Sequence, residues 1–144
     1  MPRTASVAAF ALMVAGIAGL YYTGALFAAR LPFIAVQVCA VLLMLAARIT
    51  FGRRSFHAAA NPTAGGVVST GPYAYIRHPI YAAAIYFTWA GALDHLSRMS
   101  LCWAVLLTAG AFTRMLIEER MLVERYPEYR EYQARTRRVL PFVV

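Results

Sequence analysis

Residues 71–81 read GPYAYIRHPIY and lie at the start of an apolar segment. They place Arg77 and His78 between two prolines, Pro72 and Pro79, in a chain whose longest segments are apolar. Ionisable groups beside a membrane segment are costly to keep, so they mark a candidate functional site. Pro79 favours the first turn of a helix, where its missing N–H costs nothing. Arg77 and His78 are therefore expected near a helix N-terminus, where free N–H groups favour an anion.

The composition excludes an ordinary soluble domain. Apolar residues make up 61% of the 144 residues and charged residues 14%, against roughly 45–50% and about 25% in soluble domains. A chain of this length has too little interior for that excess, so we expect a lipid bilayer around it. The net charge is +8. Its basic residues, all arginine, lie between and after apolar runs, which indicates membrane topology, and we expect no nucleic-acid partner.

Four apolar segments predict an all-α, polytopic membrane protein with about four transmembrane helices. The first segment, residues 4–29, contains no charged residue. It is longer than the apolar region of a signal peptide, which has roughly 7–15 residues. The second segment is 31–47, the third 79–93 and the fourth 99–113. The last two are short for a full crossing, at about 22 Å each.

Two further regions differ from the apolar segments. Residues 52–77 contain Asn-Pro, Gly-Gly and Gly-Pro steps that break regular structure, and we expect a cytoplasmic loop on the membrane surface there. Residues 117–144 are charged and amphipathic, which predicts C-terminal cytoplasmic helices interrupted at Pro127. We therefore interpret residues 1–144 as one integral membrane domain. It comprises two N-terminal spans in 1–51, the loop, a helical hairpin in 78–116 and the tail in 117–144.

The distribution of arginine predicts the orientation. With four spans, Arg30 and Arg98 fall on one side of the membrane and all other arginines fall on the other. By the positive-inside rule both termini are cytoplasmic, and we expect the cell (inner) membrane. The same topology brings Arg77 and the C-terminal tail to one membrane face.

Glu118 and Glu119 are the acidic candidates on that face. Adjacent residues of a helix project about 100° apart, so one carboxylate is expected to face the protein and the other solvent. A solvated amphipathic helix would explain both. Their predicted position on the same face as Arg77 favours a shared site. Interfacial tyrosines such as Tyr73 are expected as anchors, with a few lining a site, and no Cys/His cluster indicates a metal.

Two sequence blocks in the C-terminal half carry a resemblance. The first is TGPYAYIRHPIYAA, similar to the pattern G-x-Y-x-x-x-R-H-P-x-Y-x-G. The second is EERMLVERYPEYREYQARTRRVLPF, similar to E-E-x-x-L-x-x-x-(F/Y)-G followed by a Y-x-x-Y pair, basic residues and a closing proline. In this order they resemble the isoprenylcysteine carboxyl methyltransferase family of integral membrane enzymes. The chain departs from the family pattern at Ala83 and Pro127, where the family has glycine.

The resemblance implies a membrane methyltransferase that uses S-adenosyl-L-methionine, bound at the cytoplasmic face. The cofactor-binding residues that it implies are His78, Pro79, Tyr81, Tyr73 and Glu119. The implied catalytic residues are Arg77, Arg135 and Glu118. The two arginines would orient the acceptor or hold the tail against the helices.

Several acceptors and activities remain open at this stage. A carboxylate acceptor needs an arginine to hold it, whereas an amine acceptor needs a base such as Glu118 or His78. The expected acceptor is a lipophilic small molecule, such as the carboxylate of an isoprenylcysteine, or a prenylated protein. The alternative enzymes are a phospholipid N-methyltransferase and an NADPH-dependent membrane reductase. The non-enzymatic alternative is a small membrane scaffold or transporter subunit.

Overall fold

The computed structural model describes residues 2–52 and 67–140. This part of the chain is helical, with one isolated β-bridge between Ile76 and Arg137. The predicted all-α fold is confirmed. Residues 53–66 of the expected surface loop, with Arg53 and Arg54, lie outside the described residues. The elements are α1 (Pro2–Tyr22), α2 (Leu31–Phe51), the short 3-10 helix η2 (Gly71–Ala74), α3 (Pro79–Asp94), α4 (Arg98–Arg125) and α5 (Tyr129–Arg135).

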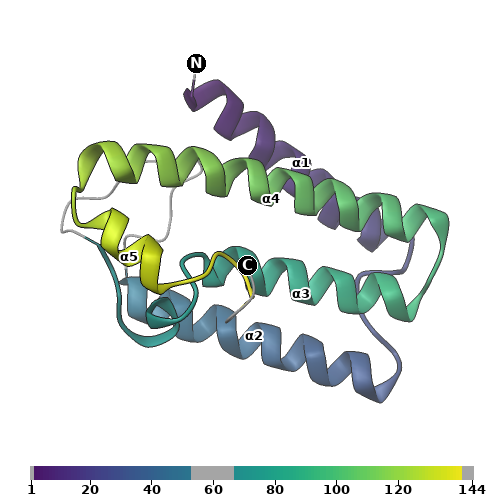
Figure 1. Cartoon of the computed structure of the whole chain (residues 1–144). Coiled ribbons are helices and arrows are strands. Elements are labelled where there is room, and N and C mark those ends of the chain that lie inside the picture. Colours follow the sequence, from purple (N-terminus) through teal and green to yellow (C-terminus); the bar gives the residue numbers. More distant parts are fainter. Residues whose placement is uncertain (1, 53–66, 141–144) are drawn as a thin grey trace.

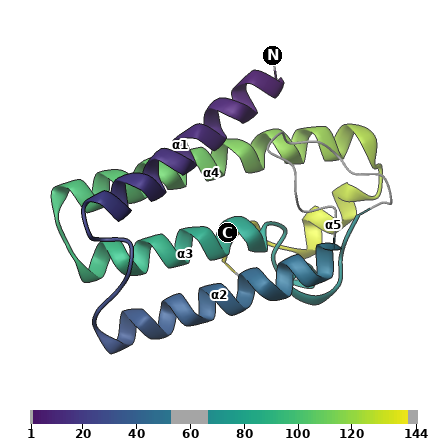
Figure 2. The same ribbon diagram turned by 180° about the vertical axis from the view of Figure 1, so that it is seen from behind.

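The long helices pack in the spatial order α1, α4, α3, α2 (Figure 1). α1 contacts mainly α4, and α2 contacts mainly α3, so α1 and α2 are the outer helices of the bundle. α5 lies at the end of the bundle where α3 begins and α4 ends, and Figure 2 shows the same arrangement from behind. We call this end, which also holds the end of α2, the tail end.

Three of the described helices are long and apolar enough to cross a membrane: α1, α2 and α4. The chain is therefore a polytopic membrane protein. α3 has 16 residues, which corresponds to about 24 Å, and it packs between α2 and α4. A crossing by α3, the third predicted span, stays a prediction.

One helix boundary differs from that expected. α1 ends at Tyr22, not at residue 29, because Gly24 adopts a φ of +69° that ends the helix. The amide of Ala25 donates to the carbonyl of Leu20 (2.8 Å), and that of Gly24 donates to Tyr21 (3.0 Å), the pair of bonds that closes a Schellman motif. α4 runs without interruption from the fourth apolar segment to Arg125. The helix ends two residues before Pro127, which agrees with the interruption expected there.

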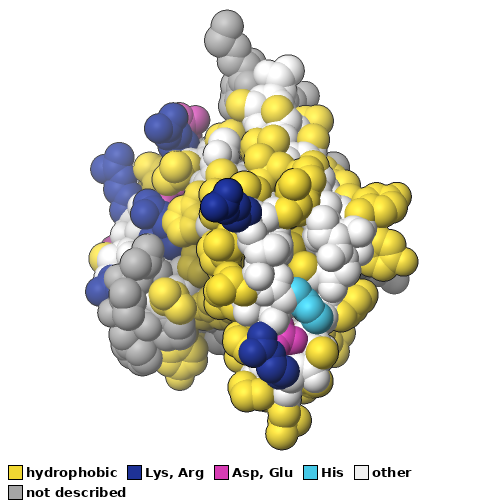
Figure 3. Space-filling view, turned by 90° about the vertical axis from the view of Figure 1, so that its right-hand side faces the viewer, with side chains coloured by type: hydrophobic (Ala, Val, Ile, Leu, Met, Phe, Trp, Pro, Cys, Tyr) yellow, Lys and Arg dark blue, Asp and Glu magenta, His cyan; other side chains and the backbone are white. Residues whose placement is uncertain are grey.

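Polar contacts fasten the end of the bundle opposite the tail end. Asp94 closes α3, and its carboxylate accepts hydrogen bonds from the amides of Ala29 (2.5 Å) and Arg30 (3.1 Å). The side chain of Arg30 also binds Asp94. Gln37 of α2 donates to the carbonyls of Leu26 (2.7 Å) and Phe87 (3.0 Å). Figure 3 shows this end, where hydrophobic side chains dominate the surface.

Candidate active site

The C-terminal segment folds back onto the start of α3. The amide of Arg137 donates to the carbonyl of Tyr75 (3.1 Å). The amide of Arg77 donates to the carbonyl of Arg137 (2.6 Å), and that of His78 donates to Arg138 (3.1 Å). These bonds fix the backbone of the Arg-His-Pro motif against the tail. The two sequence blocks, more than one helix apart in the chain, therefore meet at the tail end.

Glu119 is the centre of the first group of charged side chains. Its carboxylate accepts from Arg77 Nε (2.9 Å) and from Arg138 Nη2 (3.0 Å). His78 Nε2 lies 3.2 Å from the same carboxylate. The side chain of Glu119 is only 6% exposed, and buried charges persist where they are paired and hydrogen-bonded. We call Arg77, His78, Glu119 and Arg138 the Glu119 cluster.

A second group lies beside the first and consists of Tyr81, Arg114 and Glu118, here called the Tyr81 cluster. The Tyr81 hydroxyl donates to Glu118 and accepts from Arg114 Nε (2.8 Å). Arg114 Nη2 lies 3.3 Å from Glu118. The guanidinium of Arg114 lies over the rings of Phe10 (5.3 Å) and Tyr81 (5.9 Å). His78 Nδ1 is 3.8 Å from Glu118, so the two clusters adjoin.

The two adjacent glutamates have different environments, as expected from their helical spacing. Glu119 is enclosed by the Glu119 cluster, whereas the side chain of Glu118 is 22% exposed. Glu118 contacts Tyr81 and Arg114 rather than facing open solvent. The more accessible carboxylate of the pair is therefore Glu118.

α5 holds the tail in place through its tyrosines. The Tyr132 hydroxyl donates to the carbonyl of Tyr73 (2.6 Å), and the rings of Tyr129 and Tyr132 lie 5.6 Å apart. Arg77 Nη1 donates to the carbonyls of Gln133 (3.0 Å) and Thr136. Burial raises the pKa of Tyr129, and burial raises the pKa of Tyr132 to about 12. Both tyrosines therefore remain neutral hydroxyls at physiological pH.

The raised pKa of Tyr132 predicts that the tail is released at high pH. Its value in the folded protein, about 12, exceeds the ordinary value of 10.0. The associated stability is therefore complete below pH 10 and is lost as the pH rises toward 12. We expect tyrosinate absorbance to show a late step, which Tyr132→Phe makes smaller. Titration of every tyrosine in one step near pH 10 would contradict the buried position of Tyr132.

The structure brings most of the predicted site residues together. Those in or next to the two clusters are Arg77, His78, Pro79, Tyr81, Glu118 and Glu119. Tyr73 lies beside α5 and the end of α2. Its carbonyl accepts a hydrogen bond from Tyr132, and its ring is 5.4 Å from that of Phe51. Arg135 is exposed at the end of α5. The tail arginine that contacts Glu119 is Arg138.

The sequence reasoning missed Arg114 and Arg138 as members of the site. Arg114 directly follows the fourth apolar segment in the sequence, yet its side chain is only 4% exposed. Its spacing of four residues from Glu118 is a signal that was available, because such pairs share a helix face. Arg138 is one of three closely spaced arginines near the end of the tail. Its position beside Glu119 depends on the backbone pairing of the tail, which no local pattern reveals.

The fold and site together define an integral membrane protein with a charged, partly enclosed site at one end of its apolar helices. Residues 27–129 match the family model of phospholipid methyltransferases, and the chain belongs to that family. This membership confirms the membrane methyltransferase class expected from the two sequence blocks. No curated protein and no solved structure matches the chain significantly.

Proposed function

We propose that this protein transfers the methyl group of S-adenosyl-L-methionine to the polar head of a lipophilic acceptor taken from the bilayer. The observation that carries the proposal is the contact between Arg77 and Glu119. This contact joins the two sequence blocks into one site at the end of membrane helices. Membership of a methyltransferase family supports the reaction class.

The residues present fit the chemical groups of this cofactor, which carries an ammonium, a carboxylate and a sulfonium cation. Glu118 offers a carboxylate that is 22% exposed, which suits the ammonium. Arg138 offers a guanidinium that is 36% exposed, which suits the carboxylate. The ring of Tyr81 offers an aromatic face, which attracts cations. When bound, the cofactor supplies a methyl group that its sulfonium charge activates.

The chain's own residues would contribute mainly by positioning. In this proposal Glu119 holds the Arg-His-Pro motif and the tail together, and thereby shapes the walls of the site. Pro79 is buried at the first turn of α3 and sets where Tyr81 lies. The apolar helices exclude water from the acceptor, which strengthens the electrostatic contacts inside the site. Arg135, exposed on the tail, is a candidate for contact with the acceptor head.

Two acceptor heads remain candidates, each supported by a different observation. Family membership supports a phospholipid amine, for which His78, beside Glu118, is the candidate base that takes up the proton that the nitrogen loses. The buried guanidinium of Arg114 supports a carboxylate, such as that of an isoprenylcysteine, which needs a cation to hold it. In either case we propose that the tail end and both termini are cytoplasmic, because most arginines lie there.

Calorimetry of the purified protein with S-adenosylhomocysteine tests the proposal. We expect saturable binding, with no competition from NADPH. Labelled methyl transfer to phosphatidylethanolamine and to N-acetyl-S-farnesylcysteine would then distinguish the two acceptor heads. Binding of NADPH in place of the nucleoside would favour a reductase, and absence of both ligands would favour a scaffold or transporter subunit. Either of these outcomes would overturn the proposal.

A further inference from the structure

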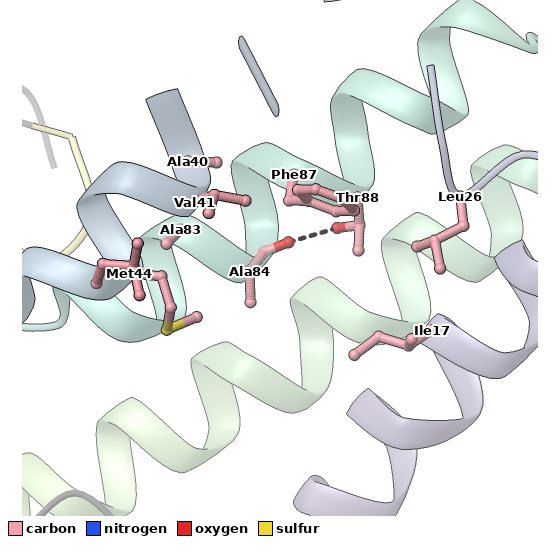
Figure 4. Close-up of a pocket in the computed structure, with 10 residues that line it drawn as sticks. Ile17, Leu26, Ala40, Val41, Met44, Ala83, Ala84, Phe87 and Thr88 are labelled. Atoms are coloured by element: carbon pink, nitrogen blue, oxygen red, sulfur yellow. Dashed lines mark hydrogen bonds between the residues drawn. The ribbon is translucent and has the colours of Figure 1, made fainter. Parts of the chain in front are cut away.

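An apolar cavity of about 280 Å³ lies among α1, α2 and α3 (Figure 4). Its walls are apolar, and the hydroxyl of Thr88 is buried and donates to the carbonyl of Ala84 (2.8 Å). The residues that line it are Ile17, Leu26, Ala40, Val41, Met44, Leu45, Ala83, Ala84, Phe87 and Thr88. A hydrocarbon chain is the ligand chemistry that suits such walls.

The rim of the cavity faces outward and its inner end is closed. Ile17, Val41 and Leu45 are between 40% and 52% exposed, so they border an opening toward lipid. Leu26 belongs to a buried apolar cluster, and Phe87 packs against that cluster. The cavity is therefore open to the bilayer at its side and bounded at the end away from the tail.

The cavity lies beneath the Tyr81 cluster, as the helical register shows. On α3, Ala84 and Thr88 follow Tyr81 by three and seven residues, spacings that share a helix face. On α1, Ile17 follows Phe10 by seven residues, and Phe10 contacts Arg114. Seven residues of helix correspond to about 10 Å. On α1 and on α3, the face that contacts or belongs to the Tyr81 cluster therefore also lines the cavity.

We propose that this cavity holds the hydrocarbon chain of the methyl acceptor, with Ala84 as the residue that gives the chain access. The inference rests on the proposed function, because the Tyr81 cluster is the place where the acceptor's head would react. One hydrocarbon chain enters the cavity sideways, between α1 and α2. A phospholipid acceptor would leave its second chain in the bilayer.

A photoreactive single-chain lipid tests this placement without requiring turnover. The probe is lysophosphatidylcholine with a diazirine in its chain, at low mole fraction in phosphatidylcholine nanodiscs that contain the full chain. We expect saturable labelling of residues 40–45 and 83–88, competed by lysophosphatidylethanolamine. Ala84→Phe places a ring where the chain would lie, and a loss of about 1.4 kcal/mol of chain binding would lower this labelling about tenfold. The matched control is Ala35→Phe, since Ala35 is exposed on α2 outside the cavity.

The outcomes separate this inference from the proposed function. Labelling that is spread along the lipid-facing helices, does not saturate and is equal in both variants would show bulk lipid only, and would overturn the inference. S-adenosylhomocysteine binding is measured in the same nanodiscs. Binding of the nucleoside with non-specific labelling overturns the chain site alone. Loss of nucleoside binding by the wild-type protein overturns the proposed function and with it the acceptor assignment.

Discussion

Glu119→Gln is expected to lower methyl transfer by at least about 100-fold and to weaken S-adenosylhomocysteine binding. The substitution removes the negative charge that Arg77 and Arg138 share, and it leaves the buried guanidinium of Arg77 without its counter-ion. Breaking a buried ion pair by removing one partner costs about 3–5 kcal/mol, and each 1.4 kcal/mol corresponds to about tenfold. The tail should therefore detach from the start of α3, and the walls of the site should separate.

Glu124→Gln is the matched control for this experiment. Glu124 is exposed on the same helix, so the same loss of charge should change activity and binding little. Both variants should insert in membranes, because the apolar helices are unchanged. Cleavage of the tail at its arginines by trypsin should accelerate in Glu119→Gln only. Wild-type turnover by Glu119→Gln, with a protected tail, would contradict the central position of Glu119.

The sequence predicted the helical segments well where hydropathy decides them. It placed Pro79 at the start of α3, and α2 begins at Leu31 as expected. It failed at residue 22, because an apolar run continues beyond the point where Gly24 ends the helix. Hydropathy indicates whether a residue prefers lipid or water. The end of a helix depends instead on backbone hydrogen bonds. A glycine within the run is not a sufficient signal, because Gly16 and Gly19 lie inside α1.

Part of the candidate site was predictable, because charged residues beside membrane helices are costly and therefore mark a functional site. Arg77, His78 and Glu119 were all identified, and they lie within hydrogen-bonding distance. Arg138 and Arg135 could not be told apart, because the choice depends on how α5 ends and on which residue pairs with Tyr75. By sequence pattern each tail arginine is a solvated charge, and only the tertiary fold pairs one of them, Arg138, with Glu119. Tertiary pairing therefore decides which arginine contacts Glu119.

Arg114→Lys is expected to lower kcat by about 100-fold, the size of effect seen when one preorganised donor is removed from a reacting group. Lysine keeps the positive charge beside Glu118. It loses the planar fork that reaches both Tyr81 and Glu118, and it loses the flat contact with the ring of Phe10. A compact ammonium does not reproduce that geometry.

The decisive experiment on Arg114 measures kcat and the affinity for S-adenosylhomocysteine separately. Arg114→Lys leaves in place the carboxylate of Glu118 and the ring of Tyr81, the two groups beside Arg114 that are proposed to contact the cofactor. S-adenosylhomocysteine should therefore bind Arg114→Lys nearly as tightly as the wild type. Arg120→Lys supplies the control, since Arg120 is exposed one turn and a half further along α4. An equal loss of nucleoside affinity and kcat would show that Arg114 supports the fold only. An unchanged kcat would show that the acceptor reacts away from Tyr81, so that the carboxylate-holding role of Arg114 would have to be abandoned.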